Sequence, residues 1–300
     1  MFLADVMGTY DVFRGSADTS VVEGMQVPIN DPALLIPAMA HATEHLGFAY
    51  TSSVLQMPPF TFARQASTLD HLTGGRVGWN VVTSYLRNAA TNLGLSDLPA
   101  HDERYDQADE YLDVAYKLWE GSWEDDAVIR DTVNGIHADP RKVHPIHHQG
   151  RHYSVEGPHL CEPSPQRTPL LFQAGSSTRG RTFAARHAEC VFFVESLKAV
   201  KGPASVVRDI RDLLRKKRDF VDDEEDKKKV DDLYARTELE EISVESIPES
   251  LLRFFRGKQR PILADVKPSD PHSIIPGLIN WIDAYGTQSL GHFVYIFPDF

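Results

Sequence analysis

Short apolar runs separated by segments of helical periodicity constrain this chain most. Each run ends in small polar residues, and a helical pattern follows most of them, which is typical of parallel βαβ units. The expected strands are Phe2–Val6, Phe48–Ser53, Arg76–Val82, Leu170–Gln173 and Cys190–Val194. The expected helices are Pro32–Leu46, Phe60–Leu72, Tyr105–Leu118 and Arg179–Arg186. The sequence therefore predicts an α/β protein built on a parallel sheet.

The segment 121–168 interrupts this rhythm because it is rich in Gly, Pro and His and shows little periodicity. Loops of that length are usually functional insertions. Charged residues dominate after about residue 205, which favours a solvated helix or linker. Ile262–Val266 and Phe293–Phe297 are candidate late strands, with a helix over Ile274–Tyr285 between them. We expect one domain over 1–300, with 121–168 inserted and 206–300 divergent.

Composition excludes several classes of function. The net charge of −12 disfavours a nucleic-acid surface and docking on anionic lipid, since both need clustered Lys and Arg. No apolar run has the length of a membrane span, and the first residues lack the basic region of a signal peptide. Two cysteines, Cys161 and Cys190, make no disulfide framework. A cytoplasmic location is therefore expected.

Polar side chains gather where the expected strands end. They are Asp5, Thr51-Ser52-Ser53, Asn80, Thr83-Ser84, Gln173 and Ser176-Ser177. The carboxyl ends of parallel strands meet at one edge, where α/β proteins bind ligands. His101, Arg104 and Tyr105 would add a titratable group, a bidentate cation and a stacking ring. This chemistry suits a polar, phosphorylated cofactor.

Histidines offer two metal alternatives. His41, Glu44 and His45 match the H-x-x-E-H pattern of some zinc proteases, in which two histidines lie on one helix face. Short patterns recur by chance, so an outward-facing pair is favoured and a zinc hydrolase is kept as a distant alternative. The histidines of the insertion have no defining spacing, and a solvated loop is favoured over a metal cluster.

Several longer stretches resemble the bacterial-luciferase-like flavin monooxygenases. The resemblance is to the branch that contains nitrilotriacetate monooxygenase component A and dibenzothiophene-sulfone monooxygenase, and it runs from residue 1 to about 205. The stretches that carry it are 2–11 (FLADVMGTYD), 26–32 (QVPINDP), 73–84 (TGGRVGWNVVTS), 101–111 (HDERYDQADEY), 157–169 (GPHLCEPSPQRTP) and 172–176 (FQAGS).

The resemblance implies a TIM (β/α)8-type barrel and a two-component FMNH2-dependent monooxygenase. A separate NAD(P)H:flavin reductase would supply FMNH2, and a C4a-peroxyflavin would insert one oxygen atom from O2 into a small organic substrate. The implied FMN contacts are Asp5, Ser53, Asn80, Thr83, His101, Tyr105 and Ser176. Tyr10, Gln26 and His101 would face the reacting centre, with His101 as the acid/base or peroxide-stabilising group. No metal is implied, and a homo-oligomer is compatible with the sequence.

The chain departs from the family pattern at both ends. Family members are longer and begin with a strand and helix ahead of the strand expected at Phe2. We therefore expect an incomplete barrel that lacks its first strand, with an exposed edge at Phe2–Val6. A catalytically impaired flavin-binding remnant is the alternative function. The residues that would choose the substrate lie in the least similar regions.

Overall fold

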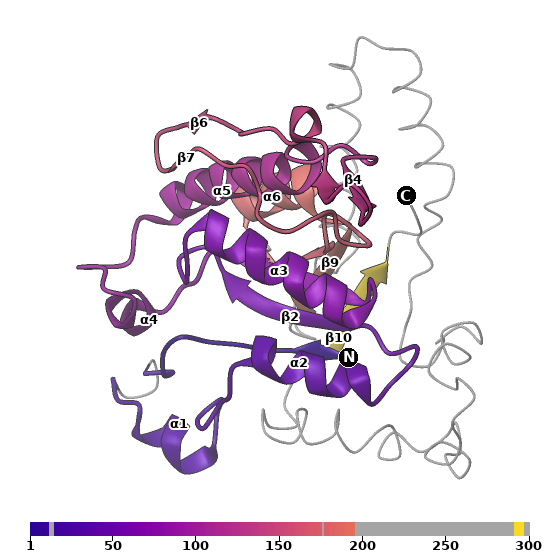
Figure 1. Ribbon diagram of the computed structural model, residues 1–300. Coiled ribbons are helices and arrows are strands. Elements are labelled where there is room, and N and C mark those ends of the chain that lie inside the picture. Colours follow the sequence, from indigo (N-terminus) through magenta and orange to yellow (C-terminus); the bar gives the residue numbers. More distant parts are fainter. Residues whose placement is uncertain (12–14, 176, 196–290, 297–300) are drawn as a thin grey trace. The chain divides into compact units, whose positions relative to one another are not determined.

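A computed structural model describes residues 1–11, 15–175, 177–195 and 291–296 (Figure 1). The chain divides into two compact units. Unit 1 comprises Met1–Tyr10 and Ile29–Gln173, and unit 2 comprises Asp11–Pro28 and Ala174–Phe300. None of the described helices combines the length and apolar character needed to cross a membrane.

Unit 1 is built on four parallel strands. Their order is β1 (Phe2–Leu3), β2 (Phe48–Ser53), β3 (Val77–Val82) and β8 (Leu170–Gln173). Three helices connect them along the chain: α2 (Pro32–His41), α3 (Pro59–Thr73) and α5 (His101–Gly121). Figure 1 shows α3 lying along β2. The predicted α/β class with a parallel sheet is confirmed.

The helix-facing side of the sheet carries the aromatic core of unit 1. Tyr50 and Trp79 are register partners on β2 and β3, so both side chains point to the same face. On that face Phe62 of α3 lies 4.2 Å from Trp79 between ring centroids, and Tyr111 and Trp119 of α5 lie within 6.5 Å of Trp79. All of these rings are buried. Large apolar side chains thus occupy the helix-facing side of the sheet, whereas β2 and β3 carry smaller side chains on the opposite face.

Helix α2 is shorter than predicted. Asp31 is its N-cap, and Asp31 Oδ1 accepts the N–H of Ala33 (2.9 Å). The helix ends at His41 rather than at Leu46. Side chains satisfy the carbonyls near its end: Thr43 Oγ1 donates to Met39 O (2.9 Å), and Arg76 Nη2 donates to Ala40 O (2.9 Å). The helix therefore ends without the glycine that the sequence suggested.

The insertion 121–168 contains two hairpins and a short 3₁₀ turn that periodicity did not predict. The first pairs β4 (Val128–Asp131) with β5 (Ile136–Ala138), and the second pairs β6 (His148–Gln149) with β7 (Ser154–Val155). The 3₁₀ turn spans Pro140–Lys142.

Buried polar contacts hold the second hairpin on α5. The Glu110 carboxylate accepts the N–H groups of His152 (2.9 Å) and Tyr153 (2.8 Å). The Asp70 carboxylate on α3 likewise accepts from the backbone N–H (2.8 Å) and the side chain (2.6 Å) of Gln166, in the segment that leads back to the sheet.

Other short elements complete the described chain. They are α4 (Arg87–Asn92) in unit 1, and α1 (Asp18–Glu23), α6 (Thr178–His187), β9 (Cys190–Glu195) and β10 (Gly291–Ile296) in unit 2. Sequence periodicity missed α1 and α4. The strand expected at Phe293–Phe297 exists as β10, but it is antiparallel to β9, whereas strands of the predicted barrel run parallel. Ile262–Val266 and Ile274–Tyr285 lie outside the described residues.

Candidate functional site

The sheet face opposite the helices carries small and polar side chains toward the strand ends. Thr51 and Asn80 are register partners there, one residue along from the Tyr50–Trp79 pair. Asn80 is 6% exposed and donates through Nδ2 to Thr51 Oγ1 (3.0 Å). Its Oδ1 is buried and has no hydrogen-bond partner among the residues that the structure describes. A buried unpaired acceptor is costly, which points to a donor on a bound molecule.

The ends of β1 and β2 carry a carboxylate and hydroxyls. Asp5 accepts the N–H of Val6 through Oδ1 (2.9 Å). Burial raises the pKa of Asp5, hydrogen bonds from Val6 and Gln56 oppose that rise, and the charge of Asp31 adds to it. Gln56 Oε1 also accepts from Ser53 N (3.4 Å). Gln56 therefore links the ends of both strands.

Helix α4 holds the segment that follows β1. Asn88 Nδ2 donates to Thr9 O (2.6 Å), and Asn92 Nδ2 donates to Met7 O (2.9 Å). Gly8 packs so closely that a Cβ there would lie 2.7 Å from the backbone nitrogen of Ala89. This docking fixes the position of Tyr10, two residues further on.

Tyr10 lies beside the turn that follows β3. Its ring centroid is 6.3 Å from that of Tyr85. Burial, and then the neighbouring Tyr85 hydroxyl, raise the pKa of Tyr10, so its phenol stays protonated near neutral pH. Tyr10 can therefore donate a hydrogen bond but cannot serve as a ready base.

The first turns of α5 bring three polar side chains toward the end of β3. His101 opens the helix, donates through Nδ1 to Asp102 Oδ1 (2.7 Å), and is half-exposed. The ring of the buried Tyr105 lies 5.1 Å from that of His101. Arg104, also buried, donates through Nη1 to Ser84 O (2.6 Å).

The predicted site residues divide by unit. Seven of them lie in unit 1, around the ends of β1, β2 and β3 and the start of α5: Asp5, Tyr10, Ser53, Asn80, Thr83, His101 and Tyr105. Gln26 belongs to unit 2 and has a positive φ of 54°. Ser176 lies outside the described residues. The sequence did not indicate that Gln56 supports Asp5 or that Asn88 supports Thr9, because these partners are distant along the chain.

The zinc alternative loses its structural premise. Helix α2 ends at His41, so His45 does not follow one turn later on the same helix face. His41, Glu44 and His45 are largely exposed. Over the described ranges, no group of three or more His, Cys, Asp or Glu side chains is arranged to hold a metal ion. Several histidines of the insertion instead face single glutamates, as His144 faces Glu124 (2.9 Å) and His147 faces Glu156 (2.8 Å).

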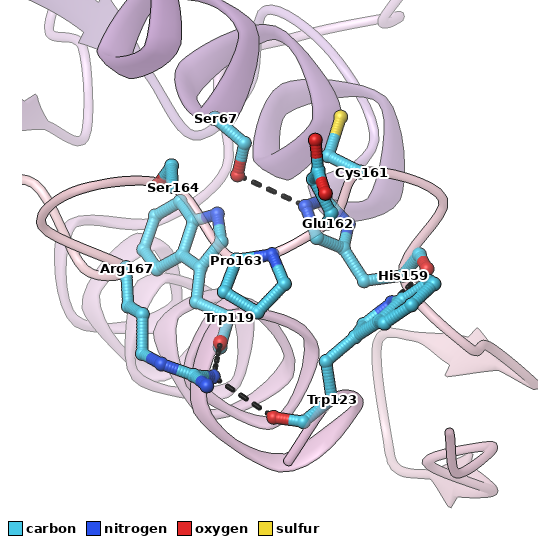
Figure 2. A pocket seen from close by; sticks show the side chains of 9 residues that line it. All are labelled: Ser67, Trp119, Trp123, His159, Cys161, Glu162, Pro163, Ser164 and Arg167. Atoms are coloured by element: carbon cyan, nitrogen blue, oxygen red, sulfur yellow. Dashed lines mark hydrogen bonds between the residues drawn. The ribbon is translucent and has the colours of Figure 1, made fainter. Parts of the chain in front are cut away.

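A shallow depression lies away from these strand ends, between α3, the end of α5 and residues 159–167 (Figure 2). It encloses about 180 Å³, part of it open to solvent, and none of the predicted site residues lines it. A hydrogen bond joins Ser67 Oγ to His159 Nε2 (2.9 Å), and Arg167 donates to the carbonyls of Trp119 (3.1 Å) and Trp123 (3.0 Å). These contacts anchor the insertion to the helices.

Acid is expected to destabilise the protein through His159. Burial, and then the charge of His71, lower the pKa of His159 to about 4. An unfolded histidine binds a proton near pH 6.5, so between pH 6.5 and 4 the unfolded state takes up a proton that the folded state refuses. Stability should fall by about 3 kcal/mol over that range. Urea unfolding at pH 7 and 4.5 measures it, and His159→Gln should flatten the pH dependence while His137→Gln leaves it unchanged. An unaltered slope in His159→Gln would contradict this assignment.

Gly78 keeps β3 close to a ring of β8 on the small-residue face. A Cβ at Gly78 would lie 2.7 Å from Phe172 Cε2 and 3.1 Å from Leu170 O. Gly78→Ala should therefore displace the Phe172 ring and lower the free energy of unfolding by about 1–3 kcal/mol. Gly47→Ala is the matched control, because the atom nearest to a Cβ at Gly47 would be Arg76 O at 3.8 Å, an ordinary contact. Equal urea midpoints for the two variants would show that Phe172 moves aside at no cost.

Comparisons with known proteins identify the family of this chain. The family model described as "Luciferase-like monooxygenase" matches residues 15–222. A long-chain alkane monooxygenase of Geobacillus thermodenitrificans is 62% identical over 202 residues, covering 66% of this chain and 46% of that protein. A dimethyl-sulfide monooxygenase of Hyphomicrobium sulfonivorans is 56% identical over 211 residues, covering 70% and 44%. The chain thus spans about half the length of these relatives.

Solved structures give the same result. A crystal structure of a long-chain alkane monooxygenase has a TM-score of 0.69 and 59% identity, covering 72% of this chain and 49% of that one. A riboflavin lyase "with modified FMN and substrate Riboflavin" has a TM-score of 0.64 and 45% identity, covering 71% and 47%. These similarities confirm the predicted fold class.

Proposed function

Because the chain belongs to the luciferase-like monooxygenase family, we propose that it is an FMN-dependent monooxygenase. FMNH2 would come from a separate NAD(P)H:flavin reductase, and the substrate would be a small organic molecule. The observation that carries the proposal is the unpaired, buried Oδ1 of Asn80 on the small-residue face of the sheet. An amide acceptor in that position suits a donor of a bound heterocycle.

The residues at the strand ends fit a flavin. Asp5, Ser53, Asn80 and Thr83 would hold polar atoms of the cofactor, and the buried ring of Tyr105 would pack beside it. Ser176 would add a hydroxyl. When bound, reduced FMN supplies the electrons that activate O2 for insertion of one oxygen atom into the substrate.

The proposed catalytic roles differ in how each group handles protons. His101 is half-exposed and paired with Asp102, so it can exchange protons with solvent and serve as the acid/base group. Tyr10, whose pKa is raised by burial, would act only as a hydrogen-bond donor at the reacting centre. Gln26 stays a residue that the family resemblance predicts at the reacting centre.

The test has two stages. Anaerobic titration with FMN and FMNH2, followed by flavin fluorescence and calorimetry, measures binding. Asn80→Ala should weaken binding by about tenfold, as expected for loss of one or two buried hydrogen bonds, whereas Asn134→Ala on the β4–β5 turn should not. Turnover is then measured with FMNH2, ¹⁸O2 and either an alkane or a thioether, since relatives bearing both kinds of name match the chain.

The outcomes separate the hypotheses. Flavin binding with ¹⁸O in the product supports the proposal and identifies the substrate class. Flavin binding without oxygen transfer to either substrate favours the impaired flavin-binding alternative. A chain that binds neither form of FMN contradicts both. A cytoplasmic location and a homo-oligomer stay predictions.

A further inference from the structure

Arg104 is a buried cation without a carboxylate partner among the described residues. It is 6% exposed and lies on α5 between His101 and Tyr105. Its Nη1 donates to one carbonyl, Ser84 O, at 2.6 Å, and its buried Nε has no hydrogen-bond partner in the described part of the chain. Five other arginines each pair with a carboxylate: Arg87, Arg130, Arg141, Arg151 and Arg167. Burying a guanidinium for a single backbone contact is costly, which indicates a functional role for the contact between Arg104 and the Ser84 carbonyl.

The carbonyl that Arg104 holds belongs to a residue in an unusual conformation. Ser84 has a φ of +61°, in the left-handed region that residues with a side chain rarely occupy. Such a conformation persists only when surrounding contacts impose it, and such positions cluster at functional sites. The contact from Arg104 is a charge-assisted hydrogen bond to the strained residue itself.

The conformation of Ser84 decides where its neighbours lie. Thr83 precedes it at the end of β3, and Tyr85 follows it and lies beside the ring of Tyr10. If Ser84 relaxed to a negative φ, the chain would leave β3 in another direction. The Tyr10–Tyr85 pair would then be altered, whereas Thr83, which precedes Ser84, would stay with β3.

We propose that Arg104 is a positioning residue of the flavin site: its guanidinium holds the Ser84 carbonyl and so keeps Ser84 in the left-handed conformation that places Tyr85 beside Tyr10. This proposal rests on the proposed flavin-dependent function, because one of its tests measures the affinity for FMN. The turn itself can be observed without any cofactor.

A rescue experiment tests the role. Arg104→Met keeps the volume of the side chain but removes the donors, so Ser84 should relax to a negative φ. The turn must then regain its strained conformation when FMN binds, which should weaken FMN binding by about 10- to 100-fold. Glycine adopts a positive φ without strain. Adding Ser84→Gly to Arg104→Met should therefore restore affinity to within about fivefold of wild type, a conversion of less than 1 kcal/mol. Adding Ser84→Ala should not.

Two further variants protect the test against loss of folding. Ser84→Val leaves Arg104 intact but places a β-branched residue where φ is positive, and it should weaken FMN binding as much as Arg104→Met. Arg87→Met removes an exposed arginine of α4 and should leave the affinity unchanged. Urea midpoints and far-UV circular dichroism establish that each variant is folded.

Amide hydrogen exchange of residues 83–85, without flavin, gives a second readout. Arg104→Met should speed exchange there by tenfold or more, with little change in β2. Wild-type affinity in Arg104→Met, or rescue by Ser84→Ala equal to that by Ser84→Gly, would overturn the proposal. If the wild-type protein binds no FMN, the proposed function fails. The role of Arg104 in the turn is then tested by hydrogen exchange alone, and equal exchange rates at residues 83–85 in Arg104→Met and wild type would overturn it.

Discussion

Phe62→Ala is expected to lower the free energy of unfolding by about 4 kcal/mol, since truncating a fully buried phenylalanine typically costs 3–5 kcal/mol. The Phe62 side chain is fully buried. Its ring lies 4.2 Å from that of Trp79 and 6.0 Å from that of Tyr111, so it joins the sheet to α5 as well as to its own helix. Urea unfolding followed by tryptophan fluorescence measures the loss, because Trp79 and Trp119 report on this core.

Leu72→Ala on the same helix is the matched control. Leu72 is 58% exposed, so its truncation should change stability by less than about 0.5 kcal/mol. A similar loss in both variants would contradict the assignment of this stability to the burial of Phe62, since alanine has the higher helix propensity in both cases. A loss below 1 kcal/mol in Phe62→Ala would mean that the core collapses into the space left behind.

The sequence predicted the central strands well, most clearly β2 and β3, which are buried on both faces along nearly their whole length. β2 and β8 match the expected ranges, and β3 differs by one residue. Such strands appear as continuous apolar runs that end in polar residues. Helix faces are harder to predict: Leu69 and Leu72 are three residues apart in the expected helix, a spacing typical of one face, yet Leu69 is buried and Leu72 is exposed. Spacing gives the stripe of a helix but not the width of the surface that covers it.

Elements that depend on distant contacts could not be predicted. The β6–β7 hairpin has no local pattern, and it is held by the Glu110 carboxylate some forty residues earlier in the chain. The early end of α2 likewise depends on Arg76, which donates to the carbonyl of Ala40 in the last turn of the helix. In both cases a charged side chain far along the sequence satisfies backbone groups, and no window of sequence contains both partners.

The candidate site follows the same division. The strand-end residues were predictable, since the carboxyl ends of parallel strands meet at one edge. Their supports were not. Asn88 holds Thr9 from 79 residues away, and Arg104 holds Ser84 from the start of another helix. The residue types that contact a ligand can thus be found from the strands, whereas the residues that fix their geometry are found only in the fold.

Arg76 links the ends of α2 and α3 to the segment before β2, at the end of the sheet opposite the candidate site. Nη2 donates to Ala40 O of α2 (2.9 Å), and Nε donates to Thr73 O of α3 (2.7 Å). Nη1 donates to Leu46 O (2.9 Å), and the guanidinium also lies 5.8 Å from the centroid of the Phe48 ring. Three carbonyls from separate segments therefore converge on one side chain.

Arg76→Met should lower the free energy of unfolding by about 3–5 kcal/mol, because it removes a charged donor from three carbonyls and a hydrogen bond to a charged group contributes about 1.5–3 kcal/mol. The loss stays below the sum of three such bonds, since Ala40 O keeps the N–H of Thr43 (3.3 Å). Arg76→Lys should recover only part of that loss, since an ammonium cannot present the guanidinium's planar fork to three directions at once. Arg87→Met, at an exposed pair with Asp97, should cost less than about 1 kcal/mol. Urea unfolding compares the three. Full recovery in Arg76→Lys would show that charge alone holds the segments together, whereas partial recovery assigns the link to the geometry of the guanidinium.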